Sequence, residues 1–549
     1  MQTKTRIFIG LLFILAVKVL PAQSPVRTEI SIEPGAIFND GISKCRIKID
    51  LRGKNPNMVS IKFISDYNIS FTADGFNNPQ VSFPMFDDGT HGDNVANDNI
   101  YCIGGIRSIL KPQNLYGFEL ISFAFVIDGT EYPINFMWLP IVQKENFNIR
   151  TIDSNTMSSN YAVHLFNLSL EDRENTNKVI HRFYELFPDK YDFILLYRDR
   201  ISSTSAYYTG VRNDIKGIGL ELYNSRVWGS IGQLQGIISI DTKGQRTPMP
   251  EDVIMHEFGH RWGSYYKDSL LPLSSIMSHW NASSTITGMM GPCCNNTFQY
   301  NGDSTFTHKN FYNYWRFKPI ELYTMGVLPV SILDTCELYV LKDPNIDQVF
   351  NGNIPTGSII KPKEFVKVTS DNIEKIYGKR EPNFQNSQKS FRTATIILTE
   401  SQPAEEEICL WNKIIRNYSD SYNGVDFFDY YANRWWGVPS FAYYCKGLVS
   451  NNFLISDSTP LFIPDNSIEE NKSLDNLVYP NPANNILNIK LIKVGAYSIN
   501  IITLDGRLIH NVKMDGNLFQ IDISSLDKGE YIITIRSEEF FRSKKFIKF

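Results

Sequence analysis

The alternation of apolar and polar residues divides the chain into three folded parts. Between residues 23 and 148, short runs of alternating apolar and polar side chains are separated by turn residues. Such runs predict β-strands, and three of them cover residues 28–32, 45–51 and 118–127. The pattern therefore predicts an N-terminal β-sandwich over residues 23–148.

The pattern changes after residue 148. A helical stretch at 175–187 precedes an apolar strand at 191–197, and this mixture predicts an α+β domain over residues 149–465. The polar segment 466–476 predicts a linker. Residues 477–549 return to short alternating strands with glycine turns, so we expect a multidomain protein that ends in a second, small β-sandwich.

The first 22 residues predict a secretory signal peptide. Lys4 and Arg6 precede an apolar core at 7–17, and Leu20-Pro21-Ala22 supplies a cleavage region. The apolar core is too short for a transmembrane span, and no other apolar run approaches that length, so we expect no span in the mature chain. The net charge of −4 over 549 residues carries no nucleic-acid signature.

The segment from His256 to His260, with the sequence HEFGH, carries the candidate chemistry. Two histidines four positions apart share one face of a helix, so both imidazoles can reach one zinc ion. Glu257 lies beside the first histidine, where it can take a proton from a metal-bound water and pass it to a leaving amine. The plain alternative is an amphipathic helix with two structural histidines. The HExxH pattern nevertheless favours a zinc peptidase.

The apolar run GIISI at 236–240 directly precedes this helix and predicts a short strand. We expect a sheet edge above the helix that could hold an extended peptide. A strand, then a helix with HExxH, then a distant third ligand is the order found in zincin peptidases.

A catalytic zinc ion usually has three protein ligands and a water. The metzincin spacing would place the third ligand at Tyr266, but a tyrosine hydroxyl ionises only near pH ~10. His279 is the first choice, because it follows a polar loop of suitable reach and supplies a third imidazole. Glu321 is the runner-up and His308 a weaker candidate. Structural roles are open for His279, as a stacked loop histidine, and for Glu321, as a charge at a helix N-terminus.

Two further roles are expected around the metal. Tyr323 is predicted to steady the oxyanion of the reaction. Either Met289 or Met290 could form a floor beneath the ion, although a methionine that fills a core gap is the simpler interpretation.

Several motifs in a fixed order resemble a group of large secreted bacterial proteins described as zinc metalloproteases. The resemblance covers about residues 150 to 450, and its motifs are HEFGHRWG (256–263), HW (279–280), TGMMG (287–291), GDSTF (302–306), IELYTMG (320–326), REP (380–382) and QKSFR (388–392), the last leading into a strand at 393–398. It implies a secreted hydrolase with His256, His260 and His279 on zinc and Glu257 as base. It does not imply a substrate.

The acidic loop at 86–101 resembles the DDGxxGDxxAxDxxY loop of immunoglobulin-like modules in secreted bacterial proteins. Its carboxylates, Asp87, Asp88, Asp93 and Asp98, could bind Ca²⁺, which prefers oxygen ligands. We favour Asx turns without metal, because the spacing is not that of an EF-hand.

The tail resembles the C-terminal sorting domain of the type IX secretion system. The resemblance rests on YPNPA (479–483), LNI (487–489), IITLDGR (501–507), LDKGEY (526–531) and KKFIKF (544–549). It implies that the type IX secretion machinery carries the chain across the outer membrane, that the tail is removed, and that the protein is released or attached to the cell surface.

Seven cysteines are too few for a dense disulfide framework. Cys45 and Cys102 could pair within the N-terminal domain. Cys293 and Cys294 could bond to Cys336, Cys409 or Cys445, and the odd total leaves one thiol over.

Three classes of function fit these features. The first is a secreted zinc endopeptidase that acts on protein or glycoprotein. The second is a zinc hydrolase of a non-peptide bond, and the third is a surface adhesin with an inactive or structural zincin domain. The intact Glu257 favours an enzyme.

Overall fold

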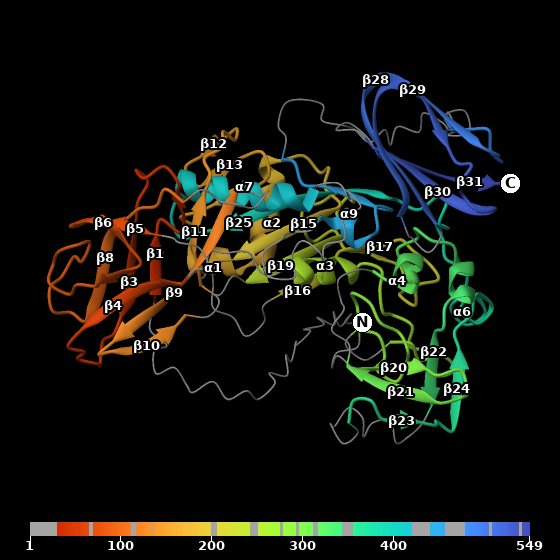
Figure 1. The fold of residues 1–549 in the computed structure, drawn as a ribbon, viewed down its shortest axis with the longest axis horizontal. Helices are drawn as coiled ribbons and strands as arrows, with labels where there is room; N and C mark the ends of the chain where they lie inside the picture. The colour runs from red at the N-terminus through yellow and green to blue at the C-terminus, as the bar shows by residue number, and fades with distance from the viewer. Residues whose placement is uncertain are drawn as a thin grey trace, which may run out of the picture.

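A computed structural model describes most of the chain. The described residues are 30–64, 70–110, 117–134, 137–198, 206–241, 251–274, 278–291, 296–310, 317–342, 355–419, 440–455, 478–503, 508–536 and 541–549. The predicted signal peptide 1–22 and linker 466–476 lie outside them. The fold is mostly β, with 41% strand and 15% helix, so sheets rather than helices set the architecture (Figure 1).

Two sheets that share one core form the N-terminal part. The first has the order β1 (Ile30–Glu33), β3 (Cys45–Asp50), β8 (Ile100–Ile106). The second has the order β2 (Ile37–Phe38), β11 (Leu139–Val142), β9 (Phe118–Ile127), β4 (Val59–Ile64), β7 (Ser82–Pro84), with β10 (Thr130–Pro133) on β9. Alternate residues such as Ile47, Ile61 and Phe123 are buried between the sheets. The three strands predicted here are confirmed to within two residues at each end.

A larger mixed sheet holds the middle of the chain. Its order is β12 (Arg150–Asp153), β13 (Thr156–Ser158), β14 (Val163–Leu165), β25 (Ser390–Leu398), β15 (Phe193–Arg198), β19 (Gly236–Asp241), β16 (Ala206–Gly210), with β26 (Ser450–Asn452) on β25. Strands β14, β25, β15 and β19 are parallel to one another. Every residue of β15 and β19 is buried, because helices cover both faces.

Those helices divide between the two faces of the sheet. Helix α2 (Thr176–Leu186), predicted from its periodicity, packs on one face through Val179, Ile180 and Phe183. Helices α3 (Glu251–Gly259) and α7 (Glu405–Ser419) pack on the other. The helix of the HExxH motif therefore lies directly against the sheet.

The predicted strand at 236–240 is confirmed, but its expected place at the sheet edge is wrong. Strand β19 pairs with β15 on one side and with β16 on the other. Among the described strands, the antiparallel β16 is the outer one. The uniformly apolar sequence of β19 is typical of a strand with neighbours on both sides and helices on both faces.

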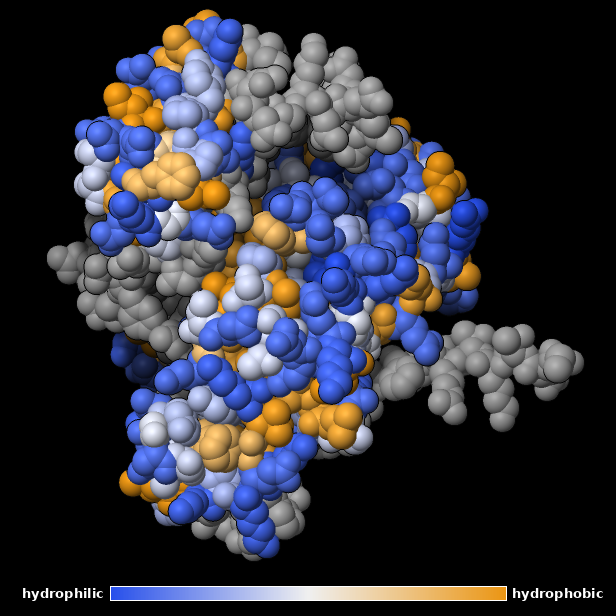
Figure 2. Space-filling model, turned by 90° about the vertical axis from the view of Figure 1, so that its right-hand side faces the viewer, coloured by the Kyte–Doolittle hydropathy of each residue, from blue (hydrophilic) through white to orange (hydrophobic). Residues whose placement is uncertain are grey.

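Smaller elements complete the middle part. They are β17 (Arg212–Asn213) paired with β18 (Tyr223–Asn224), the sheet β20 (Asn296–Tyr300), β21 (Phe306–Asn310), β23 (Ile359–Ile360), the pair β22 (Tyr339–Lys342) and β24 (Glu364–Lys367), and the helices α4 (Pro319–Thr324), η1 (Val330–Thr335), α6 (Ser370–Tyr377) and α9 (Phe441–Tyr444). Also in the middle part, α1 (Leu170–Glu174) leads into α2, and in the N-terminal part β5 (Phe71–Ala73) pairs with β6 (Phe76–Gln80). On the face in Figure 2, apolar residues are scattered among hydrophilic ones.

Helix α7 joins the N-terminal sheets to the central domain. The Gly35 amide donates to Glu407 Oε1 at 3.1 Å, and the Ser43 hydroxyl donates to Glu406 Oε1 at 2.6 Å. Lys413 forms an ion pair with Glu145 at 2.7 Å. Phe38 and other N-terminal residues belong to the same core cluster as α7, so the contact is an apolar interface as well.

The C-terminal part is one continuous sheet of five strands among the described residues. Its order is β27 (Val478–Tyr479), β28 (Ile486–Thr503), β30 (Gly529–Arg536), β31 (Phe541–Lys548), with β29 (Leu508–Asp522) on β28. We predicted two facing sheets. The 18-residue β28 instead pairs with β27 near its start and with β30 near its end, which joins both halves by hydrogen bonds.

The predicted pairing of Cys45 with Cys102 is wrong, because both are free thiols. Cys45 lies opposite Ile106 and Cys102 lies opposite Lys48, three positions further along β3. Such an offset is about 10 Å, beyond the reach of a disulfide. Cys409 and Cys445 are also free, which removes two of the three partners suggested for Cys293 and Cys294; that pair lies outside the described residues.

None of the helices in the described part of the chain is both long and apolar enough to cross a membrane.

Candidate metal centre

Three imidazoles converge beside α3. His256 and His260 lie one turn apart on or just after this helix, and His279 reaches them from the loop before Trp280. One ring nitrogen from each residue lies within 4.8 Å of those of the other two, and the Nε2 atoms of His256 and His279 are 2.9 Å apart. Two nitrogens on one tetrahedral zinc ion are about 3.3 Å apart, so this spacing suits a single ion.

The protonation of these rings also suits a metal. The Nδ1 atom of His256 lies 2.7 Å from the carbonyl oxygen of Met289 and must donate to it, which leaves the lone pair on Nε2. Burial lowers the pKa of His256 to about 4, and burial lowers the pKa of His260 well below its usual value. Both rings are therefore neutral at pH ~7, the form that binds a cation.

Glu257 is buried beside this cluster. Its carboxylate accepts a hydrogen bond from the main-chain N–H of Tyr208 in β16, and its Oε2 lies 3.9 Å from Nε2 of His260. Burial raises the pKa of Glu257 to about 8, and the bond from Tyr208 acts in the opposite direction. A carboxyl group with such a pKa can accept and return a proton near neutral pH.

Met290 packs against α3, which agrees with the simpler interpretation of a methionine that fills a core gap. A Cβ atom added at Gly259 would come within 2.3 Å of Met290 Sδ, and one at Gly263 within 3.0 Å of Met290 Cγ. Met290 is thus the residue that packs on α3, while the main chain of Met289 accepts the bond from His256.

Glu321, our alternative third ligand, is absent from the group of converging ligand atoms among the described residues. Its two oxygens instead accept four N–H groups: those of Trp280 Nε1 (3.0 Å), Met290 (2.6 Å), Met289 (3.1 Å) and Lys318 (2.6 Å). Burial raises the pKa of Glu321 to about 7. The Glu321 side chain therefore holds the loop 288–291 by hydrogen bonds, and it does not join the three converging histidines.

The charged and polar groups around Tyr323 are not the three histidines, and its oxyanion role stays a prediction. Its hydroxyl group is buried with Tyr266, Glu374 and Arg380 around it, and burial raises its pKa to about 12. Residues 321 and 323 are about 200° apart around a helix, so when Glu321 faces the metal loop, Tyr323 faces the opposite side. His308 is also elsewhere, on β21, with Nδ1 3.2 Å from the Pro355 carbonyl oxygen.

Sequence reasoning missed two tyrosines next to the motif. Tyr208 supplies the N–H that holds Glu257, and the hydroxyl of Tyr265 donates to the His260 carbonyl oxygen. The only signal in the sequence was the tyrosine pair in the short run AYYTG before the predicted strand.

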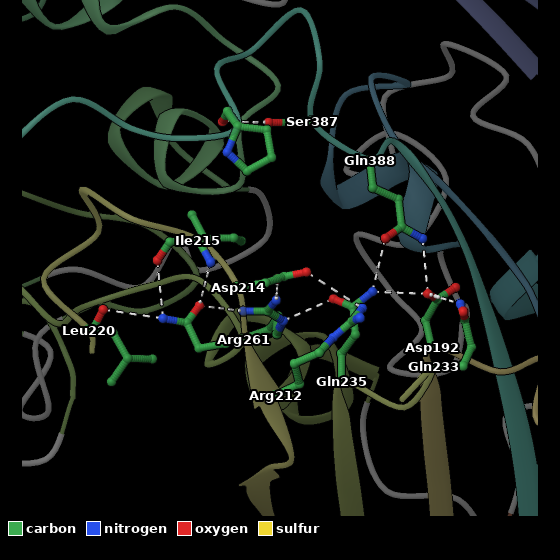
Figure 3. Close-up of polar contacts among 12 residues, drawn as sticks. Asp192, Arg212, Asp214, Ile215, Leu220, Gln233, Gln235, Arg261, Ser387 and Gln388 are labelled. Carbon is green, nitrogen blue, oxygen red and sulfur yellow. Dashed lines mark hydrogen bonds and ion pairs between the residues drawn. The ribbon is translucent and has the colours of Figure 1, made fainter. Parts of the chain in front are cut away.

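Arg261, the residue after His260, is also missing from the sequence-based site. It is buried and donates to Gln235 Oε1 at 3.0 Å, Asn213 Oδ1 at 3.1 Å and Asp214 Oδ1 at 2.8 Å. Gln235 continues the network to the buried Asp192 at 2.9 Å (Figure 3). The network ties the end of the motif to the start of β19.

The acidic loop brings Asp87, Asp93 and Asp98 together, with carboxylate oxygens within 4.8 Å of one another. Asp88 is not in this group and accepts the Thr90 amide instead. The clustered oxygens already accept main-chain N–H groups from two residues further on, from Val95 to Asp93 at 3.2 Å and from Ile100 to Asp98 at 2.9 Å. These are the turns that we favoured, and Ca²⁺ binding stays a prediction.

The C-terminal sheet belongs to a known class of module. Residues 477–548 match the family described as "Secretion system C-terminal sorting domain". The chain therefore carries a type IX secretion sorting domain and is a secreted or cell-surface protein. No curated protein matches the chain.

Proposed function

We propose that this protein is a secreted zinc endopeptidase. The observation that carries the proposal is the convergence of His256, His260 and His279 beside the buried carboxyl group of Glu257. These three histidines would hold the zinc ion. A bound zinc ion supplies a Lewis acid for the scissile carbonyl and lowers the pKa of a bound water.

The protein's own groups would then perform the proton transfers. Glu257 accepts the proton of the attacking water and returns it to the leaving amine. The main-chain N–H of Tyr208 beside this carboxylate favours its ionised form, which is the form that accepts a proton. Because His256 and His260 are neutral near pH 7, protonation of these rings does not compete with metal binding at that pH.

The proposed substrate is protein or glycoprotein that binds in an extended conformation. Strand β16 is one of the two outer strands of the described sheet, and the main-chain N–H of its residue Tyr208 lies beside Glu257. A peptide that paired with this strand would lie beside the proposed general base.

The domain assignments extend the same proposal. Residues 149–465 would form a zincin-like metallopeptidase domain and residues 23–148 an immunoglobulin-like module. The type IX secretion machinery would recognise residues 477–549 and remove them after export. Support comes from the described sheets and from the matched sorting domain.

The test is cleavage of casein and of a peptide library by the purified protein, with and without a chelator, beside the Glu257→Gln variant. Loss of cleavage in both controls supports the endopeptidase. One zinc ion per chain without cleavage of any peptide would favour a hydrolase of another bond or an adhesin with an inactive zincin domain.

A further inference from the structure

We propose that Glu321 is a positioning residue that holds two of the three histidines in place for the metal. The inference rests on the proposed zinc site, but it concerns metal binding and not the reaction. Glu321 lies on α4, at least 30 positions along the chain from the loop that it holds.

The Glu321 carboxylate is buried and accepts hydrogen bonds from several N–H groups of the protein. It is 1% exposed, and its oxygens accept N–H groups from the loop 288–291, from the Trp280 ring and from its own helix start at Lys318. A buried anion is stable when several N–H groups satisfy its oxygens. Removal of the carboxylate would leave those four donors without their acceptor.

One series of these hydrogen bonds connects Glu321 to His256. Met289 donates its amide to Glu321 Oε2 at 3.1 Å, and its carbonyl oxygen accepts from His256 Nδ1 at 2.7 Å. Two hydrogen bonds through one residue, Met289, therefore connect Glu321 to the ring. Such outer contacts fix the tautomer and the orientation of a ligating imidazole.

A second series of hydrogen bonds connects Glu321 to Trp280, the neighbour of His279. The indole Nε1 donates to Glu321 Oε1 at 3.0 Å, and the Trp280 amide donates to the Met290 carbonyl oxygen at 2.9 Å. The Met290 amide itself donates to Glu321 Oε1 at 2.6 Å. Trp280 is fully buried, and hydrogen bonds hold both its indole ring and its main-chain amide. His279 is the residue directly before it.

The loop is shaped to admit this carboxylate. Gly288 has a φ of +145°, and a Cβ atom there would lie 2.3 Å from Glu321 Oε2. Only glycine permits that approach. The contact between the loop and α4 is therefore built into the main chain as well as into the side chain.

The experiment is zinc titration of the full chain against a chromophoric chelator for wild type, Glu321→Gln and Trp280→Phe, with Glu364→Gln as the exposed control. Loss of an outer partner typically weakens metal binding ~10–100-fold, and we expect a loss in that range for Glu321→Gln. Trp280→Phe, which removes one donor and keeps a ring, should show a smaller loss. Co²⁺ absorption spectra should report a changed ligand field in both variants, while Glu364→Gln binds as wild type.

Wild-type zinc affinity in a folded Glu321→Gln protein would overturn the inference. If Glu321→Gln does not fold, Trp280→Phe is the deciding variant. Wild-type zinc affinity in Trp280→Phe would then overturn the inference. Wild-type protein that binds zinc but cleaves nothing would refute the peptidase and leave the positioning role intact. Wild-type protein that binds no zinc would refute both.

Discussion

His164 on β14 offers a quantitative test of the central sheet. The side chain is fully buried, and neither ring nitrogen has a hydrogen-bond partner among the described residues. Burial alone lowers the pKa of His164 from 6.5 to about 4. The folded state must therefore keep this ring neutral at pH values where the unfolded chain binds a proton.

The sign and size of the effect follow from that difference. A lowered histidine pKa contributes stability above pH 6.5 that is lost as the pH falls from 6.5 to about 4, and no more is lost below that. The full loss is about 3 kcal/mol, from about 2.5 pKa units at 1.36 kcal/mol each. His164→Leu should remove it, because leucine has no proton to bind.

The assay is urea unfolding of wild type and His164→Leu at pH 7 and at pH ~4, followed by tryptophan fluorescence. Relative to wild type, the variant should gain about 3 kcal/mol between the two pH values. The three clustered histidines are common to both proteins, so their titration cancels in the difference. The exposed His510, substituted by leucine, controls for loss of a histidine as such. A difference that stays constant with pH would refute the reasoning.

Three further predictions concern the site and the tail. His279→Ala should weaken zinc binding by more than the ~10–100-fold expected for outer contacts, while His308→Ala binds as wild type in the same titration; full occupancy without His279 would contradict the ligand set. Arg261→Met should lower the free energy of unfolding by about 3 kcal/mol or more, because it removes three charge-assisted bonds and leaves the buried acceptor on Gln235 unpaired; an unchanged melting temperature would argue against that network. Deletion of residues 477–549 should leave the protein inside the cell envelope on fractionation and immunoblotting, and surface delivery without the tail would show that another signal suffices.

Local periodicity accounts for the parts of the site that the sequence predicted. His256 and His260 are four positions apart, and that spacing alone places both rings on one side of α3. His279 was predicted from ligand chemistry, and the structure brings it into the cluster. Helix α2 followed from its helical periodicity, and strands β9 and β15 followed from their apolar runs.

The errors concern relations between segments that are far apart in the sequence. The place of β19 inside the sheet depends on β16 pairing beside it, and the separation of Cys45 from Cys102 depends on the register of two strands. Neither relation has a local signal.

Glu321 and Tyr323 lie in one motif, but the structure gives Glu321 contacts other than those of a ligand, while the oxyanion role of Tyr323 stays a prediction. Both belong to IELYTMG, and the sequence placed both near the metal. A six-residue helix can present only one of two residues at i and i+2 to a given neighbour, and the loop with Gly288 contacts Glu321. The Glu321 carboxylate then accepts four N–H groups at 3.1 Å or less. Its lone pairs are used by these donors and need not be directed at the metal position. In the proposed site a third imidazole completes the ligand set instead, so we expect the glutamate to be needed for the geometry of the loop and not for coordination.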